Sequence, residues 1–251
     1  MRILFFTENT HYGGLDNFLI SLINHWPNSS DELSLICNQS HPGLPFVRKR
    51  LRRNCVISSN RILLDWEILS TLENTSLVTF FRRVFGFLIR YPFFIYYIFR
   101  LYFVFKKGNH DRLMIVNGGY PAGNSNRAAS IAWGLLGRPK SIHNFHNIAV
   151  KPNSSTMWVE NLIDYFVHYY TKTFVSTSKS CSETIRVRPV FSNSEKIAFI
   201  YNGTEQSSES SPIESSLKEK IGIPDNALVC SMLGTYEPRK GHHFLLKSLS
   251  Q

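Results

Sequence analysis

The sequence lacks closely spaced cysteines. Its four cysteines, Cys37, Cys55, Cys181 and Cys230, lie far apart, with no C-x-x-C pair and no Cys/His cluster at zinc spacing. This distribution excludes a disulfide framework and a structural zinc site, and it fits a reducing compartment. The first apolar run, residues 3–6, is also far too short for a secretory signal peptide. We therefore expect a cytoplasmic protein.

Three motifs of common enzyme classes are also absent. There is no G-x-G-x-x-G, so the nicotinamide or flavin fingerprint is missing. There is no G-x-S-x-G, which excludes the nucleophile elbow of serine hydrolases. No Asp-x-Asp pair occurs, so the sequence does not indicate a metal-chelating sugar-nucleotide site. We expect neither a bound metal nor a cofactor.

Positive charge is in excess, with 28 Lys and Arg against 18 Asp and Glu over 251 residues. A net charge of +10 suggests an anionic partner or, alternatively, serves only solubility. The excess is concentrated in one region of the chain, at Arg48, Lys49, Arg50, Arg52, Arg53, Arg82, Arg83, Arg90, Arg100, Lys106 and Lys107. Aromatic residues of membrane type are interleaved there and no RNA or DNA motif occurs. We expect no nucleic-acid partner; salt-dependent binding to nucleic acid would contradict this.

Short apolar runs alternate with segments of helical spacing. Strands are predicted at residues 3–6, 33–37, 113–116, 141–145, 173–176, 197–201 and 227–233. This alternation predicts an α/β protein, with a Rossmann-like parallel sheet and helices on both faces. We expect a first domain at residues 1–205, a linker and short helix at 206–226, and the first strand and helix start of a second Rossmann-like domain at 227–251.

Residues 77–105 are long enough to span a bilayer but carry Arg82, Arg83, Arg90 and Arg100. At helical spacing the four arginines fall in a sector about 100° wide, and the remainder is aromatic and aliphatic. One polar face and a broad apolar face favour a helix lying in a membrane interface. Packing on its own domain and a true span are the alternatives. Pro92 should kink or divide the helix.

A few residues at predicted strand ends have side chains or backbone suited to a ligand. Gly13 and Gly14 separate the first strand from a helix, where backbone amides can meet a phosphate or simply form a tight turn. His143 and His146 are three apart on a strand, so one should face inward and the other the cleft. Arg239 and Lys240 follow the strand predicted at 227–233, where two cations suit a diphosphate.

Taken together, these segments resemble the family 4 retaining glycosyltransferases of the GT-B fold, over nearly the whole chain. The resemblance is carried by the Gly13-Gly14 loop, by HNFHN at 143–147, by FVSTSKS at 174–180, by IYNGTE at 200–205 and by LGTYEPRKG at 233–241. It implies a GT-B N-terminal domain followed by the opening of the donor-binding domain.

The resemblance also implies roles for particular residues. His146 aligns with the catalytic histidine that contacts the donor sugar. Gly13, Gly14 and Lys240 align with donor diphosphate contacts; Thr235 stands where the family has arginine, and Arg239 is the residue that could replace it. The acceptor side is assigned to Asp16, Tyr120 and Asn147. Docking on an anionic membrane surface is assigned to Arg82, Arg83, Arg90 and Arg100.

The implied activity is metal-independent transfer of a sugar, with retention, from a nucleotide-sugar donor to a lipid-linked or other glycan acceptor in surface polysaccharide synthesis. The protein would be peripheral on the cytoplasmic face of the membrane. The family's E-x7-E pair, which grips the donor, would lie beyond Gln251. We therefore expect the 251-residue chain to be an incomplete fragment with negligible transferase activity, which a transfer assay on the purified chain checks. The alternative is a non-catalytic remnant or partner subunit of the same fold.

Overall fold

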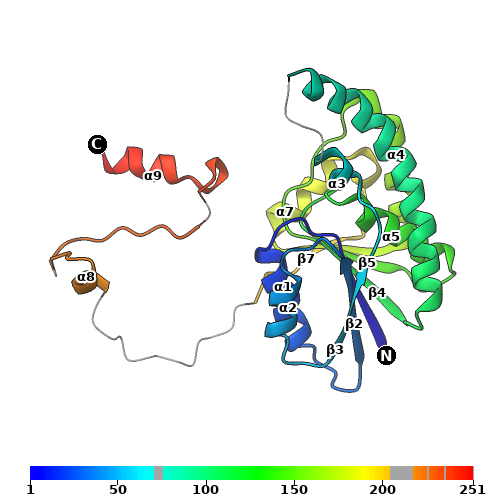
Figure 1. Ribbon diagram of the computed structural model, residues 1–251, viewed down its shortest axis with the longest axis horizontal. Coiled ribbons are helices and arrows are strands. Elements are labelled where there is room, and N and C mark those ends of the chain that lie inside the picture. Colours follow the sequence, from blue (N-terminus) through cyan, green and yellow to red (C-terminus); the bar gives the residue numbers. More distant parts are fainter. Residues whose placement is uncertain (71–75, 204–216, 225, 235, 251) are drawn as a thin grey trace. The chain divides into compact units, whose positions relative to one another are not determined.

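The chain divides into two compact units, Met1–Thr204 and Glu205–Gln251. The computed structural model describes residues 1–70, 76–203, 217–224, 226–234 and 236–250. The first unit holds the sheet and both hydrophobic cores (Figure 1).

Among the described residues, seven parallel strands form one sheet in the order β3-β2-β1-β4-β5-β6-β7. They are β1 (Arg2–Thr7), β2 (Glu32–Asn38), β3 (Cys55–Asn60), β4 (Arg112–Asn117), β5 (Ser141–Phe145), β6 (Thr171–Ser176) and β7 (Ile197–Phe199). The strand order reverses at β1, which lies between β2 and β4. This is a doubly wound, Rossmann-like sheet, and the α/β fold class predicted from the sequence is confirmed.

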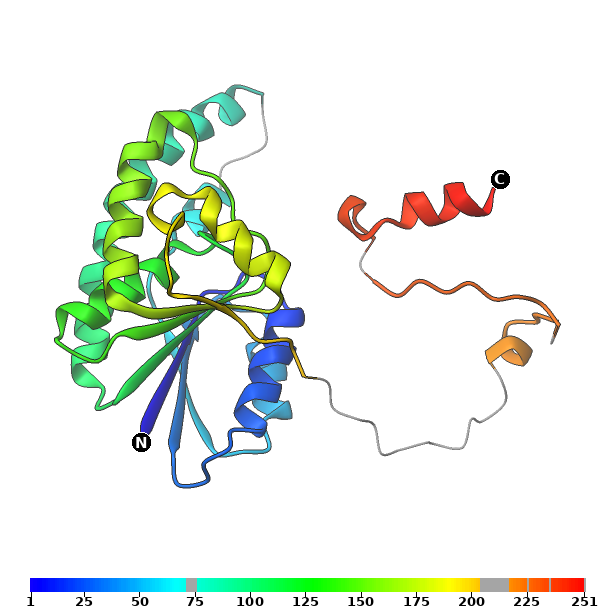
Figure 2. The same ribbon diagram turned by 180° about the vertical axis from the view of Figure 1, so that it is seen from behind.

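Helices cover both faces of the sheet (Figure 2). They are α1 (Gly14–Asn24), α2 (Leu44–Arg50), α3 (Asp65–Ser70), α4 (Ser76–Lys107), α5 (Asn124–Leu135), α6 (Met157–Tyr170) and α7 (Lys179–Thr184). The alternation of side chains along β1 explains the two layers: Ile3 and Phe5 pack with α1 and α2, whereas Leu4 and Phe6 pack with α4 and α5. Because both faces are buried, β1 reads as a continuous apolar run.

Helix α4 packs one side of itself into the core of its own unit. Phe94, Tyr97, Leu101 and Phe105 recur at helical spacing and are all buried. From the sequence we expected this helix to lie in a membrane interface and not to pack on its own domain. The structure shows that its inner face does pack in the core. The outer face stays apolar and exposed, at Ile95, Phe99 and Phe103. No helix in the described part of the chain combines the length and apolarity needed to cross a bilayer.

Pro92 lies inside α4 and does not divide it. Of the two effects predicted for Pro92, a kink or a division of the helix, the division does not occur. Proline removes one backbone hydrogen bond and crowds the preceding turn. Here Pro92 is exposed, and the buried residues that follow it, Phe94, Tyr97 and Leu101, anchor the helix in the core.

The second unit contains α8 (Leu217–Lys220), the 3-10 turn η4 (Pro238–Lys240) and α9 (His242–Leu249). The strand predicted at residues 227–233 is not formed. A strand needs a neighbour for its backbone hydrogen bonds, and the described residues supply none, leaving Leu228 and Leu233 fully exposed. Residues 206–216 of the predicted linker lie outside the described residues.

His143 is a buried polar residue in the middle of β5. Its ring stacks on Phe174 at 5.7 Å between ring centroids, and neither ring nitrogen has a hydrogen-bond partner among the described residues. Burial, reinforced by the positive charge of Arg127, lowers the pKa of His143 to about 3. The folded protein therefore holds this imidazole neutral.

We predict that His143 makes the fold acid-sensitive. The unfolded chain binds a proton at an ordinary histidine pKa near 6.5, whereas the folded chain does not until about pH 3. Stability is therefore complete above pH 6.5 and falls as the pH drops below it. Between pH 7 and pH 5, His143 should remove about 2 kcal/mol of unfolding free energy. In urea titrations, the unfolding free energy of His143→Phe should fall less between pH 7 and pH 5 than that of the unaltered protein, by about 2 kcal/mol. An equal fall in the two proteins would contradict the prediction.

Candidate functional site

The candidate site lies at the carboxyl edge of the sheet, where β1 and β4 are neighbours. Ligands of open α/β sheets bind at such a point because the loops leaving the two strands diverge to opposite faces. The loop after β1 carries Gly13 and Gly14 into α1. A side chain built at either glycine would meet no atom within 4 Å, and the same is true of Gly118 after β4. The edge therefore has open space directly beside backbone.

Two helices, α1 and α5, start at this point. Only in α5 does a side chain of the described residues accept a hydrogen bond from a backbone amide of the first turn. At α5 the buried carboxylate of Glu8 accepts a hydrogen bond from the Ser125 amide at 2.9 Å. A side chain at Gly123 would lie 2.8 Å from the same carboxylate. Burial raises the pKa of Glu8, and the bonds from Ser125 oppose this rise. Glu8 thus occupies the start of α5.

At α1 the first amides are open. Among the described residues, no hydrogen-bond acceptor contacts the backbone N–H groups of Gly14 and Leu15. Unsatisfied amides and the helix dipole make this terminus attractive to an anion. An anionic group bound at the carboxyl edge would therefore be directed to α1 and not to α5.

Asp16 is used within the protein itself. Its carboxylate is fully buried, accepts the Gly13 amide at 2.8 Å and contacts Nε2 of His41 at 2.7 Å. Asp16 thus supports the glycine loop, and its assignment to the acceptor side stays a prediction. His41, at the end of β2, was not singled out from the sequence, since its partner lies 25 residues away.

The structure separates the two histidines of the HNFHN segment. His143 is sealed in the core, and His146 lies just past the end of β5, half-buried against Phe18 with 4.4 Å between ring centroids. Burial lowers the pKa of His146 to about 4, so its ring is neutral at physiological pH. Its Nε2 is shielded from solvent and has no hydrogen-bond partner among the described residues. A buried nitrogen without a partner is unfavourable, and a neutral imidazole nitrogen can pair with a ligand hydroxyl.

Backbone contacts join the loop after β4 to the loop after β5. Asn147, which is exposed, donates from its backbone amide to Gly118 at 3.0 Å, and its side-chain amide donates to the same carbonyl. Val150 donates to the Tyr120 carbonyl at 2.8 Å. Tyr120 itself is buried, and its hydroxyl donates to Asp164 at 2.8 Å. Its assignment to the acceptor side stays a prediction.

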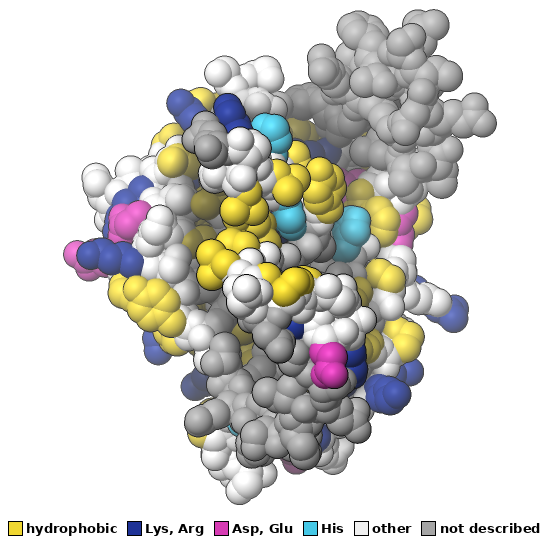
Figure 3. All heavy atoms as spheres, turned by 90° about the vertical axis from the view of Figure 1, so that its left-hand side faces the viewer, with side chains coloured by type: hydrophobic (Ala, Val, Ile, Leu, Met, Phe, Trp, Pro, Cys, Tyr) yellow, Lys and Arg dark blue, Asp and Glu magenta, His cyan; other side chains and the backbone are white. Residues whose placement is uncertain are grey.

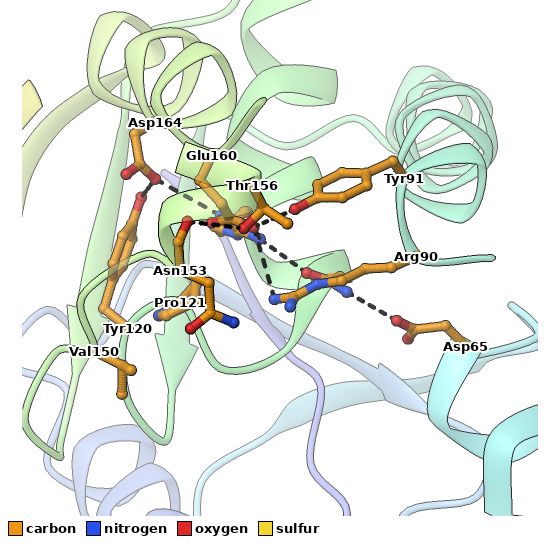
Figure 4. Close-up of polar contacts among 12 residues, drawn as sticks. Asp65, Arg90, Tyr91, Tyr120, Pro121, Val150, Asn153, Thr156, Glu160 and Asp164 are labelled. Atoms are coloured by element: carbon orange, nitrogen blue, oxygen red, sulfur yellow. Dashed lines mark hydrogen bonds and ion pairs between the residues drawn. The ribbon is translucent and has the colours of Figure 1, made fainter. Parts of the chain in front are cut away.

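A buried group of two arginines and two carboxylates is bonded to these loops. Figure 4 labels its carboxylates, Glu160 and Asp164, together with Tyr120 and Arg90. Glu160 and Asp164 of α6 face Arg127 of α5 and Arg188, which precedes the 3-10 turn η3 (Pro189–Phe191). Arg127 and Arg188 approach Glu160 at 2.7 and 2.6 Å, and Arg188 approaches Asp164 at 2.6 Å. Although burial alone would raise it, the charge of Arg127 holds the pKa of Glu160 at about 2.

This group was missed from the sequence. The available signal was a pair of acids four residues apart on the inward face of an amphipathic helix. Because carboxylates are almost never buried without a partner, this pair indicates that cations lie opposite it. Arg188 also donates to the Val150 carbonyl at 2.8 Å. The four charges therefore fix α5, α6 and the loop after β5 relative to one another.

Other predicted site residues lie elsewhere or outside the described residues. Lys240 is exposed in η4 of the second unit. Thr235 and the side chain of Arg239 lie outside the described residues, as do the side chains of Arg82 and Arg83. Arg90 turns toward Glu160, 3.9 Å away, whereas Arg100 is exposed.

The face shown in Figure 3 has histidine and hydrophobic side chains near its middle and basic side chains mainly toward its margins. In the described part of the chain, no three His, Cys, Asp or Glu residues converge as metal ligands.

We predict that Arg188→Met destabilises the protein by about 3–5 kcal/mol, because it leaves Glu160 and Asp164 buried with one cation fewer. Thermal or urea unfolding measures the loss. Arg48→Met, at an exposed arginine of α2, is the matched control and should change stability by less than about 0.5 kcal/mol. Equal effects of the two substitutions would show that the buried group is not a structural constraint.

The sequence matches no protein-family model and no curated protein. Solved structures similar to it include MurG of Acinetobacter baumannii, with 11% identity and a TM-score of 0.44 over 72% of this chain and 42% of that one. Another is CalG4, the calicheamicin glycosyltransferase, with 9% identity and a TM-score of 0.47 over 84% of this chain and 55% of that one. The chain thus spans about half the length of these two proteins.

Proposed function

We propose that the Met1–Thr204 unit is the acceptor-side domain of a glycosyltransferase that moves a sugar from a nucleotide-sugar donor to a glycan acceptor. The observation that carries the proposal is the pairing, at one sheet edge, of an open helix terminus with an unused neutral imidazole. Gly14 and Leu15 offer amides to a diphosphate, and the buried, unpartnered Nε2 of His146 is the nitrogen we assign to a sugar hydroxyl. The family 4 resemblance adds retention at the anomeric carbon.

The diphosphate leaving group is stabilised where its charge develops. In this proposal the α1 terminus contributes backbone amides and a favourable dipole. Fixed donors of this kind need no reorganisation during the reaction. We propose a reaction without a metal cofactor, because the sequence contains no Asp-x-Asp pair and offers cations in its place.

His146 orients the donor sugar while the acceptor hydroxyl attacks from the side of the first unit. Because its pKa is lowered to about 4, it acts as a neutral hydrogen-bonding group and not as a cation near physiological pH. Asp16, Tyr120 and Asn147 support the loops that border the site. Their bonds hold Gly13, Gly118 and the segment after β5 in place.

We further propose that the acceptor is lipid-linked and that the protein is peripheral on the cytoplasmic face of a membrane. Helix α4 supports this, because its 32 residues include no Asp or Glu and its outer face is apolar. Arg100, Lys106 and Lys107 are exposed on it and would favour anionic lipid.

We predict that Gly14→Asp weakens nucleotide-sugar binding, because it places a carboxylate at the anion site. A Cβ atom at this position meets no atom within 4 Å, so we expect the fold to be retained. Gly14→Asn is the isosteric neutral control. Titration calorimetry against a panel of nucleotide sugars should show affinity at least about tenfold lower for the Asp variant than for the Asn variant. Equal affinities would remove the anion site from α1.

We predict that His146→Ala lowers kcat at least about tenfold in an active protein that includes this chain, because a hydrogen bond to the reacting sugar is lost. His146→Gln keeps a hydrogen-bonding group and should retain more activity than the alanine variant. Steady-state transfer assays measure both. Unchanged kcat in the alanine variant would show that His146 does not contact the donor.

A further inference from the structure

The outer surface on one side of the sheet is made by α4 and α6, because α5 between them is buried from Asn124 through Trp133. The two helices are joined at one end, where the Tyr91 hydroxyl donates to Glu160 at 3.3 Å. Toward the other end Phe105 of α4 packs on Trp133 at 5.7 Å, and the ring of Tyr170 fills the space beside Gly134. Both helices lie on the side of the sheet opposite α1 and α2 (Figures 1 and 2).

Helix α6 presents an apolar, mainly aromatic stripe to the outside. Trp158, Leu162, Tyr165 and Tyr169 recur at intervals of three and four residues, and each is more than half exposed, Trp158 at 70%. On the opposite side of the helix, Ile163 and Val167 enter the core. A contiguous outward stripe with three large rings is unusual on a surface that faces only water.

Helix α4 presents a second apolar stripe beside it. Ile95, Phe99 and Phe103 are spaced four residues apart and are all more than half exposed. The other face of the same helix fills the core. Large apolar side chains therefore lie on both the inner and the outer face of α4, whereas a helix that faces only water has them on its inner face.

Charge on this surface has one sign. Helix α4 contains no acidic residue, and the two acids of α6, Glu160 and Asp164, are buried in ion pairs with Arg127 and Arg188. Exposed cations lie on α4, at Arg100, Lys106 and Lys107, and beside α6, at Lys140. The Nζ of Lys140 lies 5.1 Å from the centre of the Tyr169 ring, so the charge is held next to the aromatic stripe.

We infer that the surface formed by α4 and α6 docks on an anionic lipid bilayer, with the rings of Trp158, Tyr165 and Tyr169 at the level of the headgroups. Trp and Tyr prefer this interface because one part of the ring is apolar and the other is polar. The bordering cations complement anionic headgroups. The inference deepens the proposed function by naming the helices and side chains that meet lipid, and it places α6 beside α4 in that role.

Trp158 starts α6, directly after the loop that leaves the carboxyl end of β5. It therefore lies at the same edge of the sheet as His146 and the open terminus of α1. Docking through α6 would bring the candidate site close to the headgroups without inserting it into lipid.

The test uses flotation of the full chain with vesicles of phosphatidylcholine alone or of equal parts phosphatidylcholine and phosphatidylglycerol. We expect flotation with the anionic vesicles only. Of the four tryptophans, Trp158 alone is exposed, so its emission should shift to shorter wavelength on binding. Trp158→Phe should lose this shift and still float.

The double variant Tyr165→Ser with Tyr169→Ser should bind the anionic vesicles about tenfold more weakly, or less still. Tyr201→Ser, at an equally exposed tyrosine after β7, is the matched control and should bind as the unaltered chain does. Circular dichroism verifies that each variant is folded. A folded double variant with unaltered binding overturns the inference. So does a lipid-free dimer in which Trp158 is already shielded, since the occupant would then be a second copy.

Nucleotide-sugar binding, measured on the same variants without vesicles, separates this inference from the proposed function. The Tyr165 and Tyr169 rings are more than half exposed and contact Phe166, Tyr170 and Lys140, none of which belongs to the β1 or β4 loop. Their substitution should therefore leave that binding unchanged. A chain that binds anionic vesicles but no nucleotide sugar contradicts the proposed function and leaves the docking surface standing. A chain that binds nucleotide sugar but no anionic vesicles contradicts the docking surface and leaves the proposed sugar transfer standing.

Discussion

The geometry of the candidate site depends on a balanced group of buried charges. Arg127 and Arg188 face Glu160 and Asp164 in the core, where a single uncompensated charge would be costly. Because each carboxylate is shared between partners from different segments, α5, α6 and the residues before η3 cannot move independently. The bond from Tyr120 to Asp164 extends this constraint to the loop after β4, and the bond from Arg188 to Val150 extends it to the loop after β5. Open glycine-bearing backbone at the sheet edge is thus supported by a rigid layer below it.

The sheet was largely predictable because its central strands are buried on both faces. β1, β2 and β4 read as apolar runs followed by turn residues, and that pattern does not depend on distant contacts. β3 escaped prediction because it is an edge strand in which Ser58 and Ser59 interrupt the apolar pattern. Residues 227–233 have the composition of a strand, but strand formation also requires a partner, which composition cannot supply.

The site was predictable only in part, because roles depend on partners far away in the sequence. The histidine pair could be divided by strand periodicity into an inner and an outer residue, and their burial differs in that sense. The hydrogen bonds between Asp16 and His41 and between Tyr120 and Asp164 could not be predicted from local sequence patterns, because each joins separate elements of the fold. Helix α4 shows the same limit: its composition is apolar on nearly every side, and only packing shows which side is inside.

The bond between Glu8 and Ser125 has a consequence for how the chain folds. It joins residues 117 positions apart, and the pairing of β1 with β4 spans a similar distance. The first turn of α5 therefore lacks the Glu8 carboxylate as a hydrogen-bond partner until β1 has paired with β4. Loop closure over such a span is slow compared with local helix formation. α5 would consequently gain its full stability late, and the last step that completes the core would also complete the sheet edge on which the loops of the site are built.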